Sequence, residues 1–388
     1  MNANTDYYNI KSCFTEEQIL IRDATRDWVV KHVKPNIEKY FQKAETPSHL
    51  IKELASIGGF GLIFPEKYGG VNADYISFGL MMQELERGDS SIRVISSIQT
   101  SLVMYAIYKF GSEEQREKYL PKLSTGELLG AFGLTEPDFG SNPSSMHSYY
   151  KEQGDKIIIN GSKMWIGNAE TANIALVWIK DENKVVKGII IETDKITNFT
   201  TTTLKDKWSF RSSKTGELVF SDSLVDKSQV LENSTSIQDA YECLNIGRYA
   251  VAWGSVGIAT ECYETALQYS KERIQFGKPI GSNQLIQKKL TDMVTEITKA
   301  QLMCYQLGKL MNEGKANYKQ ISMAKRNNVK MAQNVARESR QILGGMGITS
   351  EYPVMRHMIN IETLITYQGT NEMHVLITGR DVTGINAF

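Results

Sequence analysis

The strongest constraint on the fold is a block of short β-rich runs that interrupts an otherwise helical pattern. Each run is four or five residues long and is dominated by Ile, Val, Leu, Trp or Phe, which favour strands. Turn formers such as Asn160-Gly161 separate the runs, which lie at 156–159, 175–179, 188–191 and 217–220. The block therefore predicts a small β-domain between about residues 130 and 237.

Helix signals occupy both flanks of this block. Thr15 with Gln18 and Ser112 with Gln115 match the capping box that begins a helix. Beyond residue 238, apolar residues recur at alternating steps of three and four, at Leu290, Met293, Ile297, Ala300, Cys304, Leu307 and Met311. Such a stripe favours packing inside an antiparallel helix bundle over a cofactor motif or an extended coiled coil.

The order of these signals predicts a mainly α protein with a β insert. We expect three domains: an N-terminal helical domain over 1–127, a middle β-barrel or sheet domain over 128–237, and a C-terminal four-helix bundle over 238–388.

Charge and cysteine usage exclude several classes of partner. Lys+Arg and Asp+Glu both number 44, so no overall field favours nucleic acid or an anionic membrane. No stretch approaches the roughly 18 apolar residues of a membrane span, and no leader pattern opens the chain, so a cytoplasmic location is expected. The four cysteines and five histidines show no metal-ligand spacing, which predicts no metal site and buried, unpaired thiols.

Five strings in chain order resemble those of the acyl-CoA dehydrogenase superfamily. They are Phe132-Gly133-Leu134-Thr135-Glu136-Pro137 with Gly140-Ser141, then Trp165-Ile166, Arg273-Ile274-Gln275-Phe276-Gly277, Gln341-Ile342-Leu343-Gly344-Gly345 and Tyr367-Gln368-Gly369-Thr370. One Gly-rich string would be weak evidence, because Gly344 to Gly347 also suits a helix-ending turn. The resemblance runs from about residue 14 to Phe388 and implies a flavin-dependent oxidoreductase.

The resemblance implies FAD as the cofactor. The segment from Phe132 to Thr135 would offer backbone groups and a hydroxyl to the polar edge of the flavin ring, where negative charge builds on reduction. Gly140-Ser141 would approach the pyrophosphate, and the strings around Arg273 and Gln341 would grip the adenosine half of a neighbouring subunit's FAD. The expected FAD set is Phe132, Leu134, Thr135, Gly140, Ser141, Trp165, Ile166, Gly167, Arg273, Gln275, Phe276, Gln284, Gln341, Gly344, Gly345, Thr370 and Glu372.

Three further stretches resemble the glutaryl-CoA dehydrogenases: 84–97, 284–290 and 379–388. The resemblance places Glu86, Arg93 and Ser97 at the far end of the acyl pocket, where an arginine pairs with the distal carboxylate of a short dicarboxylic thioester. Ser141, Tyr367 and Gly369 complete the expected substrate set. The alternative for Arg93 is a surface ion pair with Glu86 or Asp89.

The pattern breaks at both reacting ends of the site. The family's usual base is the Glu after the Tyr of the Tyr-x-Gly-Thr string, and here that position is Gln368, whose amide cannot take up a proton. Another branch places its Glu directly before an arginine that resembles Arg248, and here that position is Gly247. Gly167 stands where the family has a Ser or Thr hydroxyl that donates to the flavin.

Three hypotheses account for these departures. The first is an enzyme with another initiation step, such as loss of CO₂ from the thioester or use of a different carboxylate, with Glu86 as the candidate base and Arg248 as electrostatic support or an ordinary salt-bridge residue. The second is an attenuated FAD- and thioester-binding paralogue. The third is an engineered Glu-to-Gln form of a glutaryl-CoA dehydrogenase, against which the simultaneous Gly167 argues. A further alternative is a structural protein without flavin, which predicts a colourless protein.

The expected partners follow from the same resemblance. The acyl group is carried by coenzyme A or by a carrier protein, and electrons leave to an electron-transfer flavoprotein or to O₂. Because the FAD strings divide between neighbouring subunits, a homo-oligomer is expected, with a tetramer favoured by the bundle-type C-terminal domain. No nucleic acid or membrane partner is expected.

Overall fold

The computed structural model describes residues 5–387, so residues 1–4 and the terminal Phe388 quoted above lie outside the described range. Its first third is helical. The helices are α1 (Glu16–Trp28), α2 (Ile37–Lys43), α3 (His49–Ser56), α4 (Tyr75–Gly88), α5 (Ser90–Ser97), α6 (Tyr105–Phe110) and α7 (Glu113–Ser124), and a π-helical segment, η4 (Ile98–Met104), joins α5 to α6. Both expected capping boxes are present, at the starts of α1 and α7.

The middle of the chain forms a seven-stranded sheet in the order β1-β4-β2-β3-β7-β6, with β5 paired to β4. The strands are β1 (Gly130–Gly133), β2 (Tyr149–Gln153), β3 (Lys156–Gly167), β4 (Ile174–Lys180), β5 (Val186–Glu192), β6 (Phe199–Thr203) and β7 (Thr215–Asp226). Each of the four apolar runs lies in a strand, and β4 is buried along nearly its whole length because its two faces meet two different clusters of apolar side chains.

The expected turn at Asn160-Gly161 is wrong. Both residues lie inside β3, where the pairing register with β7 shifts between Ile159 and Gly161. Gly161 has φ 134°, and a Cβ there would lie 2.6 Å from the Cβ of Ser148 on the neighbouring segment. The glycine therefore serves a β-bulge and a close backbone approach rather than a chain reversal.

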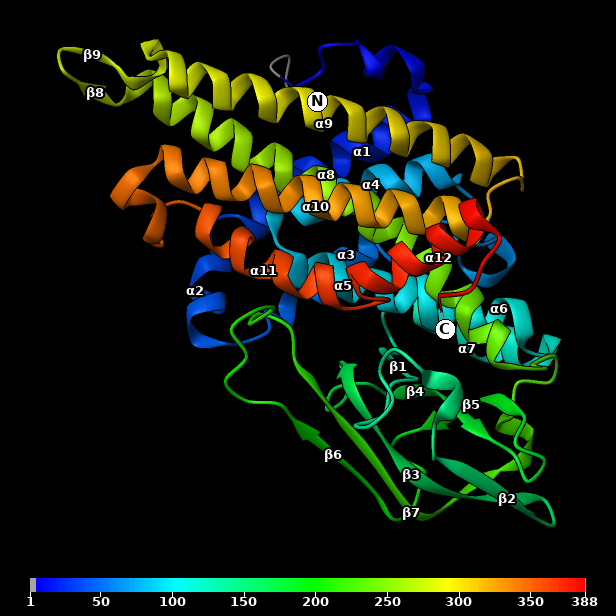
Figure 1. Ribbon diagram of the computed structural model, residues 1–388. Coiled ribbons are helices and arrows are strands. Elements are labelled where there is room, and N and C mark those ends of the chain that lie inside the picture. The colour runs from blue at the N-terminus through cyan, green and yellow to red at the C-terminus, as the bar shows by residue number, and fades with distance from the viewer. Residues whose placement is uncertain (1–4, 388) are drawn as a thin grey trace.

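The last third returns to helices: α8 (Ile237–Glu272), α9 (Gln284–Asn312), α10 (Tyr318–Ile342), α11 (Val354–Thr366) and α12 (Asn371–Thr383). A short hairpin, β8 (Ile274–Gln275) and β9 (Lys278–Pro279), extends from the end of α8 (Figure 1). The five central residues of the expected apolar stripe on α9 are buried, and α9 packs against α8, α10 and α4. The bundle interpretation of the stripe is confirmed.

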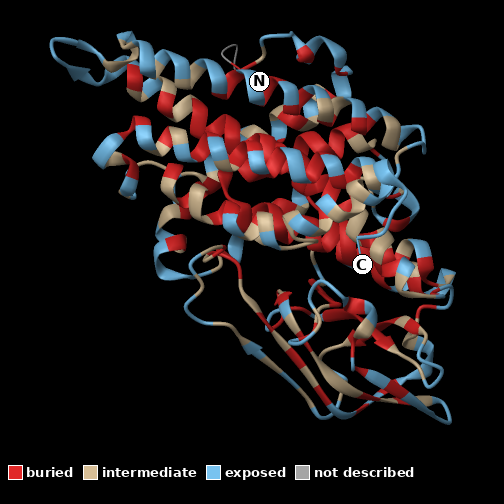
Figure 2. Ribbon diagram, in the orientation of Figure 1, coloured by how far each residue is buried: buried red, intermediate tan, exposed pale blue. Residues whose placement is uncertain are grey.

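Helix α8 is the centre of the molecule. It contacts α4, α5, α9, α10 and α11, and Figure 2 shows it and α4 as mostly buried while the hairpin and the outer side of α9 are exposed. The sheet forms a separate lobe below the helical layers (Figure 1). Of the cysteines, Cys243, Cys262 and Cys304 are buried as expected, but Cys13 is exposed because it ends a short 3-10 helix at the surface. No helix within residues 5–387 is both long and apolar enough to cross a membrane.

Candidate active site

The centre of the site is the four-residue connection between α11 and α12. Gln368 and Gly369 both have positive φ, 52° and 94°. Thr370 then caps α12 by accepting from the N–H of Met373 at 3.3 Å. A left-handed Gln costs strain that glycine avoids, so the surrounding contacts must hold this conformation.

A buried ion pair lies beside this connection. Glu86 on α4 and Arg93 on α5 pair through Oε2 and Nε, and both side chains are fully buried. Arg93 Nη2 also donates to the hydroxyl of Tyr367 at 2.5 Å. Burial opposes the charge of Arg93, but Glu86 and the hydroxyl of Tyr367 together outweigh burial and raise the pKa of the guanidinium. The ion pair expected for Arg93 exists, but its placement at the surface is wrong.

Two polar atoms of this cluster have no hydrogen-bond partner within the described residues: Nη1 of Arg93 and Oε1 of Glu86. An unpartnered buried polar atom costs about 1–3 kcal/mol, so such atoms mark places where a ligand would bond. Ser97 is also fully buried one turn beyond Arg93, and its Oγ lies 3.5 Å from that of Ser101. Glu86, Arg93 and Tyr367 therefore form one bonded polar cluster, and their role in an acyl pocket, with Ser97, stays a prediction.

The amide of Gln368 lies against the backbone of α8. A Cβ on Gly247 would lie 2.7 Å from Nε2 and 2.9 Å from Oε1 of Gln368. The amide therefore fills the space that a side chain at position 247 would need. Oε1 has no hydrogen-bond partner within residues 5–387. Gln368 and Gly247 are thus in direct contact, and neither position carries a carboxylate.

Two buried cations hold the backbone of this connection. Arg248 Nε donates to the carbonyl of Gln368 at 2.9 Å, and Lys325 Nζ donates to the carbonyls of Tyr367 at 3.2 Å and Gly369 at 2.9 Å. Burial lowers the pKa of Arg248 to about 10, and burial together with the charge of Arg248 lowers the pKa of Lys325 to about 7. Arg248 makes no salt bridge among residues 5–387, so the ordinary salt-bridge interpretation is wrong; its other partner is Asn245 Oδ1 at 2.9 Å.

The strings expected to meet the flavin lie on the sheet lobe. Phe132 and Leu134 are buried at and just after β1, while Trp165 lies at a register shift of β3 with φ 64° and 60% exposure. Gly167 ends β3, and a Cβ there would overlap Cδ1 of Ile98 in η4. The contact brings the end of β3 next to the helical segment that follows Ser97.

A buried ion pair joins β3 to the segment that follows β1. Lys163 Nζ bonds Glu136 at 2.8 Å and the carbonyl of Leu134 at 3.3 Å, with both charged side chains at least 95% buried. Burial lowers the pKa of Lys163 to about 8, although the charge of Glu136 partly restores it. Glu136 also accepts from the N–H groups of His147 and Ser148. These bonds fix the turn that contains the exposed Gly140 and Ser141.

The strings expected to hold an adenosine moiety lie elsewhere. Arg273 ends α8, Gln284 starts α9, and Gln341 precedes the end of α10, so antiparallel packing gathers them at one end of the bundle, beside the hairpin (Figure 1). Arg248 and Arg273 are 25 residues apart on one helix, which is roughly 38 Å. The exposed members are Arg273, Gln275, Phe276, Gln284, Gln341, Gly344 and Gly345.

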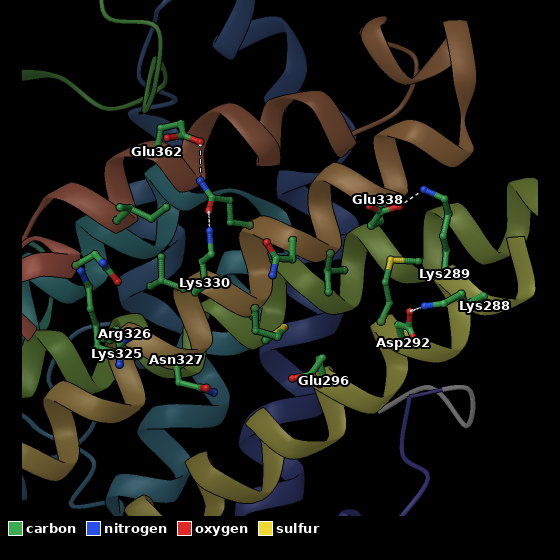
Figure 3. Close-up of a pocket in the computed structure, with 18 of the residues that line it drawn as sticks. Lys288, Lys289, Asp292, Glu296, Lys325, Arg326, Asn327, Lys330, Glu338 and Glu362 are labelled. Carbon is green, nitrogen blue, oxygen red and sulfur yellow. Dashed lines mark hydrogen bonds and ion pairs between the residues drawn. The ribbon is translucent and has the colours of Figure 1, made fainter. Parts of the chain in front are cut away.

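A groove with a cavity volume of about 920 Å³ runs from α9 across α10 to α11 and the start of α12. Figure 3 shows that charges of both signs line it, with Lys288 paired to Asp292 and Lys289 to Glu338. Lys325, which bonds the connection, also lines the groove. Because positive and negative side chains both line the groove, it favours neither an anionic nor a cationic ligand.

Sequence reasoning missed Lys325, His374 and Ile98. Lys325 had a usable signal, because it falls between Ile321 and Val329 on a helical face that should be apolar. His374 is buried behind Gly369 with its Nδ1 2.8 Å from Ser322 Oγ, and burial lowers its pKa to about 3. Glu372, expected near the flavin, is exposed at the start of α12.

Two helical domains that flank a β-lobe, with a buried polar cluster between the helices, define the acyl-CoA dehydrogenase class of protein. Models of this family match the chain in three parts: the N-terminal domain over 15–127, the middle domain over 131–223 and the C-terminal domain over 237–383. The chain belongs to the acyl-CoA dehydrogenase family, whose members are flavin-dependent oxidoreductases.

Individual relatives agree along nearly the whole chain. An acyl-CoA dehydrogenase of Bacillus subtilis (strain 168) is 35% identical over 374 residues, covering 95% of this chain and 99% of that protein. A glutaryl-CoA dehydrogenase from Mycobacterium smegmatis has a TM-score of 0.97 at 41% identity, covering 99% of both chains. A glutaryl-CoA dehydrogenase from the same organism, in complex with FADH2, has a TM-score of 0.97 at 38% identity and covers all of both chains.

Proposed function

We propose that this protein is an FAD-dependent oxidoreductase of a short, carboxylate-bearing acyl thioester, in which Gln368 occupies the position of the family base and the reaction starts without it. The observation that carries the proposal is the contact between Gln368 and Gly247. Neither of these two positions, which resemble the base positions of two branches of the family, carries a carboxylate. An amide cannot accept a proton near neutral pH.

The cofactor is FAD, which supplies a hydride acceptor. The residues fit it: Trp165 and Phe276 are exposed aromatic residues in the strained left-handed region, at φ 64° and 52°, and strain of this kind clusters at ligand-binding sites. A Cβ on Gly140, Gly344 or Gly345 would meet no atom within 4 Å, so these backbones are open to close approach. The distance between the two sets of strings supports shared sites in a homo-oligomer, for which we propose a tetramer.

The polar cluster supports a carboxylate on the acyl group. Nη1 of Arg93 has no partner within the described residues, and a guanidinium can serve a second carboxylate besides Glu86. The N–H groups of Gln368 and Gly369 also have no acceptor within residues 5–387. Backbone donors of this kind stabilise a thioester oxygen as it gains negative charge. Coenzyme A or a carrier-protein arm would present the same thioester to them.

Initiation then follows one of two routes. Either a carboxylate on the α-carbon, or conjugated to it, leaves as CO₂ and its bonding electron pair forms the enolate, or another carboxylate removes the α-proton. Glu86 is the candidate for the second route because its Oε1 is free within the described cluster. Arg248, without a salt bridge, adds positive charge behind the reacting carbon in both routes.

An anaerobic titration with glutaryl-CoA tests the proposal. The flavin absorbance of the unmodified protein and of Gln368→Glu is followed while product masses are recorded. We expect the Glu variant to bleach promptly, at least 100-fold faster than the unmodified protein, because the base alone contributes about 10²–10⁴-fold. Glu86→Gln is run beside them and should slow any residual bleaching if Glu86 is the base.

The alternative is an attenuated FAD- and thioester-binding paralogue, favoured by the same missing carboxylates. It predicts that the unmodified protein binds glutaryl-CoA but never bleaches with any thioester, including one that carries a carboxylate on its α-carbon. Prompt bleaching of the unmodified protein contradicts this alternative. Electron delivery to an electron-transfer flavoprotein or to O₂ is then read from reoxidation rates with each acceptor.

A further inference from the structure

The backbone that carries Gln368 is bonded from behind at three consecutive carbonyls. Lys325 Nζ serves the first and third, those of Tyr367 and Gly369, and Arg248 Nε serves the second. Bonds from cationic donors are shorter and stronger than neutral ones. Gln368 and Gly369 lie in neither helix, and His374 on α12 also lies close to Gly369.

A bond to the carbonyl of a peptide unit also fixes the direction of the N–H on the opposite side of that unit. In a trans peptide the N–H points away from the C=O of the same unit, and the structure has no cis bonds within its described residues. The carbonyl of Tyr367 and the N–H of Gln368 belong to one unit. A bond from Lys325 to that carbonyl therefore fixes the direction of an N–H that has no protein acceptor within residues 5–387.

We propose that Lys325 is a positioning residue: it holds the peptide units from 367 to 370 so that the N–H of Gln368 is presented to the thioester oxygen of the substrate. The inference rests on the proposed function. Lys325 lines the groove and acts through the backbone carbonyls of Tyr367 and Gly369.

The surroundings make this contact sensitive to pH. Burial and the charge of Arg248 on α8 lower the pKa of Lys325 to about 7, and Glu372 on α12 opposes that effect from the surface. His374, also on α12, stays neutral because burial lowers its pKa to about 3. Glu362 on α11 and Glu296 on α9 line the same groove. Between pH 6 and 8.5, Lys325 is therefore the group of this cluster that changes charge.

Protonation strengthens both bonds to the connection, because the ammonium carries an additional proton and a full charge. Acyl thioester affinity should therefore be highest below pH 7 and fall as pH rises through it. The probe is acetyl-CoA, which has no β-carbon and so cannot pass a hydride to the flavin. Its dissociation constant is measured by calorimetry on the FAD-loaded protein, with free CoA as the reference for ionisation of the CoA phosphates.

We expect acetyl-CoA affinity, relative to free CoA, to fall three- to tenfold between pH 6 and pH 8.5. In Lys325→Met the affinity should be weaker at pH 6 and independent of pH, with unchanged FAD content. Lys330→Met, an exposed lysine on the same helix, is the matched control and should behave like the unmodified protein. If the Met variant does not fold, Lys325→Gln, which keeps a neutral donor, should show the same flat profile.

A pH-independent affinity in the unmodified protein, or the same pH dependence in the Lys325 variants, overturns the inference. Either result leaves the proposed function intact, provided that FAD and acetyl-CoA bind. A protein that binds neither FAD nor acetyl-CoA overturns the proposed function itself, and the positioning role with it.

Discussion

At the scale of single residues, the site is shaped by side chains that fill space left by glycine. Gln368 lies against Gly247, and Ile98 lies where a side chain on Gly167 would be. A hydroxyl-bearing residue at 167 therefore requires Ile98 to move. Because the overlapping atom is the terminal methyl of a side chain that is 7% exposed, some movement is available at a cost.

Gly167→Ser tests this packing. We expect it to lower the free energy of unfolding by about 1–3 kcal/mol, and to cost about 1 kcal/mol less in an Ile98→Val background, where Cδ1 is absent. Urea unfolding of the four proteins in the cycle gives the coupling. Gly379→Ser is the control, since a Cβ there meets nothing within 4 Å, and its effect should simply add to that of Ile98→Val. Additive behaviour of the Gly167 pair would contradict the packing argument.

At the scale of elements, β3 is the strand that connects the sheet lobe to the site. It is 12 residues long, pairs with β2 and β7, and carries two register shifts, one at Gly161 and one at Trp165. Such shifts bend a strand and redirect its end, and the end of β3 at Gly167 lies against Ile98 in η4. Loss of the first bulge should disturb the whole strand.

Gly161→Ala tests the first bulge against a matched glycine. Both Gly161 and Gly154 have positive φ, but only Gly161 is in close contact, with Ser148. Gly154→Ala should cost about 1 kcal/mol from backbone strain alone. Gly161→Ala should cost at least about 2 kcal/mol more, because strain and overlap add, as measured by urea unfolding. Equal costs would show that the bulge tolerates a side chain.

At the scale of the whole molecule, buried ion pairs join helices that are distant in sequence. Arg356 on α11 pairs with Asp89 and Glu38, and Arg87 on α4 pairs with Glu261 and Glu264 on α8. Each pair links the first third of the chain to the last. Removing one partner would leave a buried charge alone, which typically costs 3–5 kcal/mol.

Two buried lysines should make the stability of the whole protein depend on pH. Burial lowers the pKa of Lys325 to about 7 and of Lys163 to about 8, whereas an exposed lysine titrates near 10.4. Between pH 7 and 9 the folded state releases these protons and the unfolded state keeps them, so stability rises with pH. Thermal unfolding from pH 7 to 9 should show this rise, and Lys325→Met should reduce its slope. A slope unchanged by Lys325→Met would contradict the assignment.

The sequence by itself determined the order of helices and strands, because capping boxes, apolar spacing and β-rich runs are local signals. It also indicated the family and the polar cluster of Glu86, Arg93 and Tyr367, because short strings carry those residue types. The expected domain boundaries and the roles of the site residues stay predictions. The bulge at Gly161 was misread as a turn, since Asn-Gly suits both and only the partner strand distinguishes them.

Only the tertiary structure decided which residues meet. Lys325 is 42 residues from Tyr367 in sequence, and Gly247 is 121 residues from Gln368, yet each pair is in contact. No local pattern encodes such contacts, because they arise when α8, α10 and the connection after α11 pack together. The same packing buries Arg248 and Lys325 away from water, and burial is the physical reason that their pKa values fall.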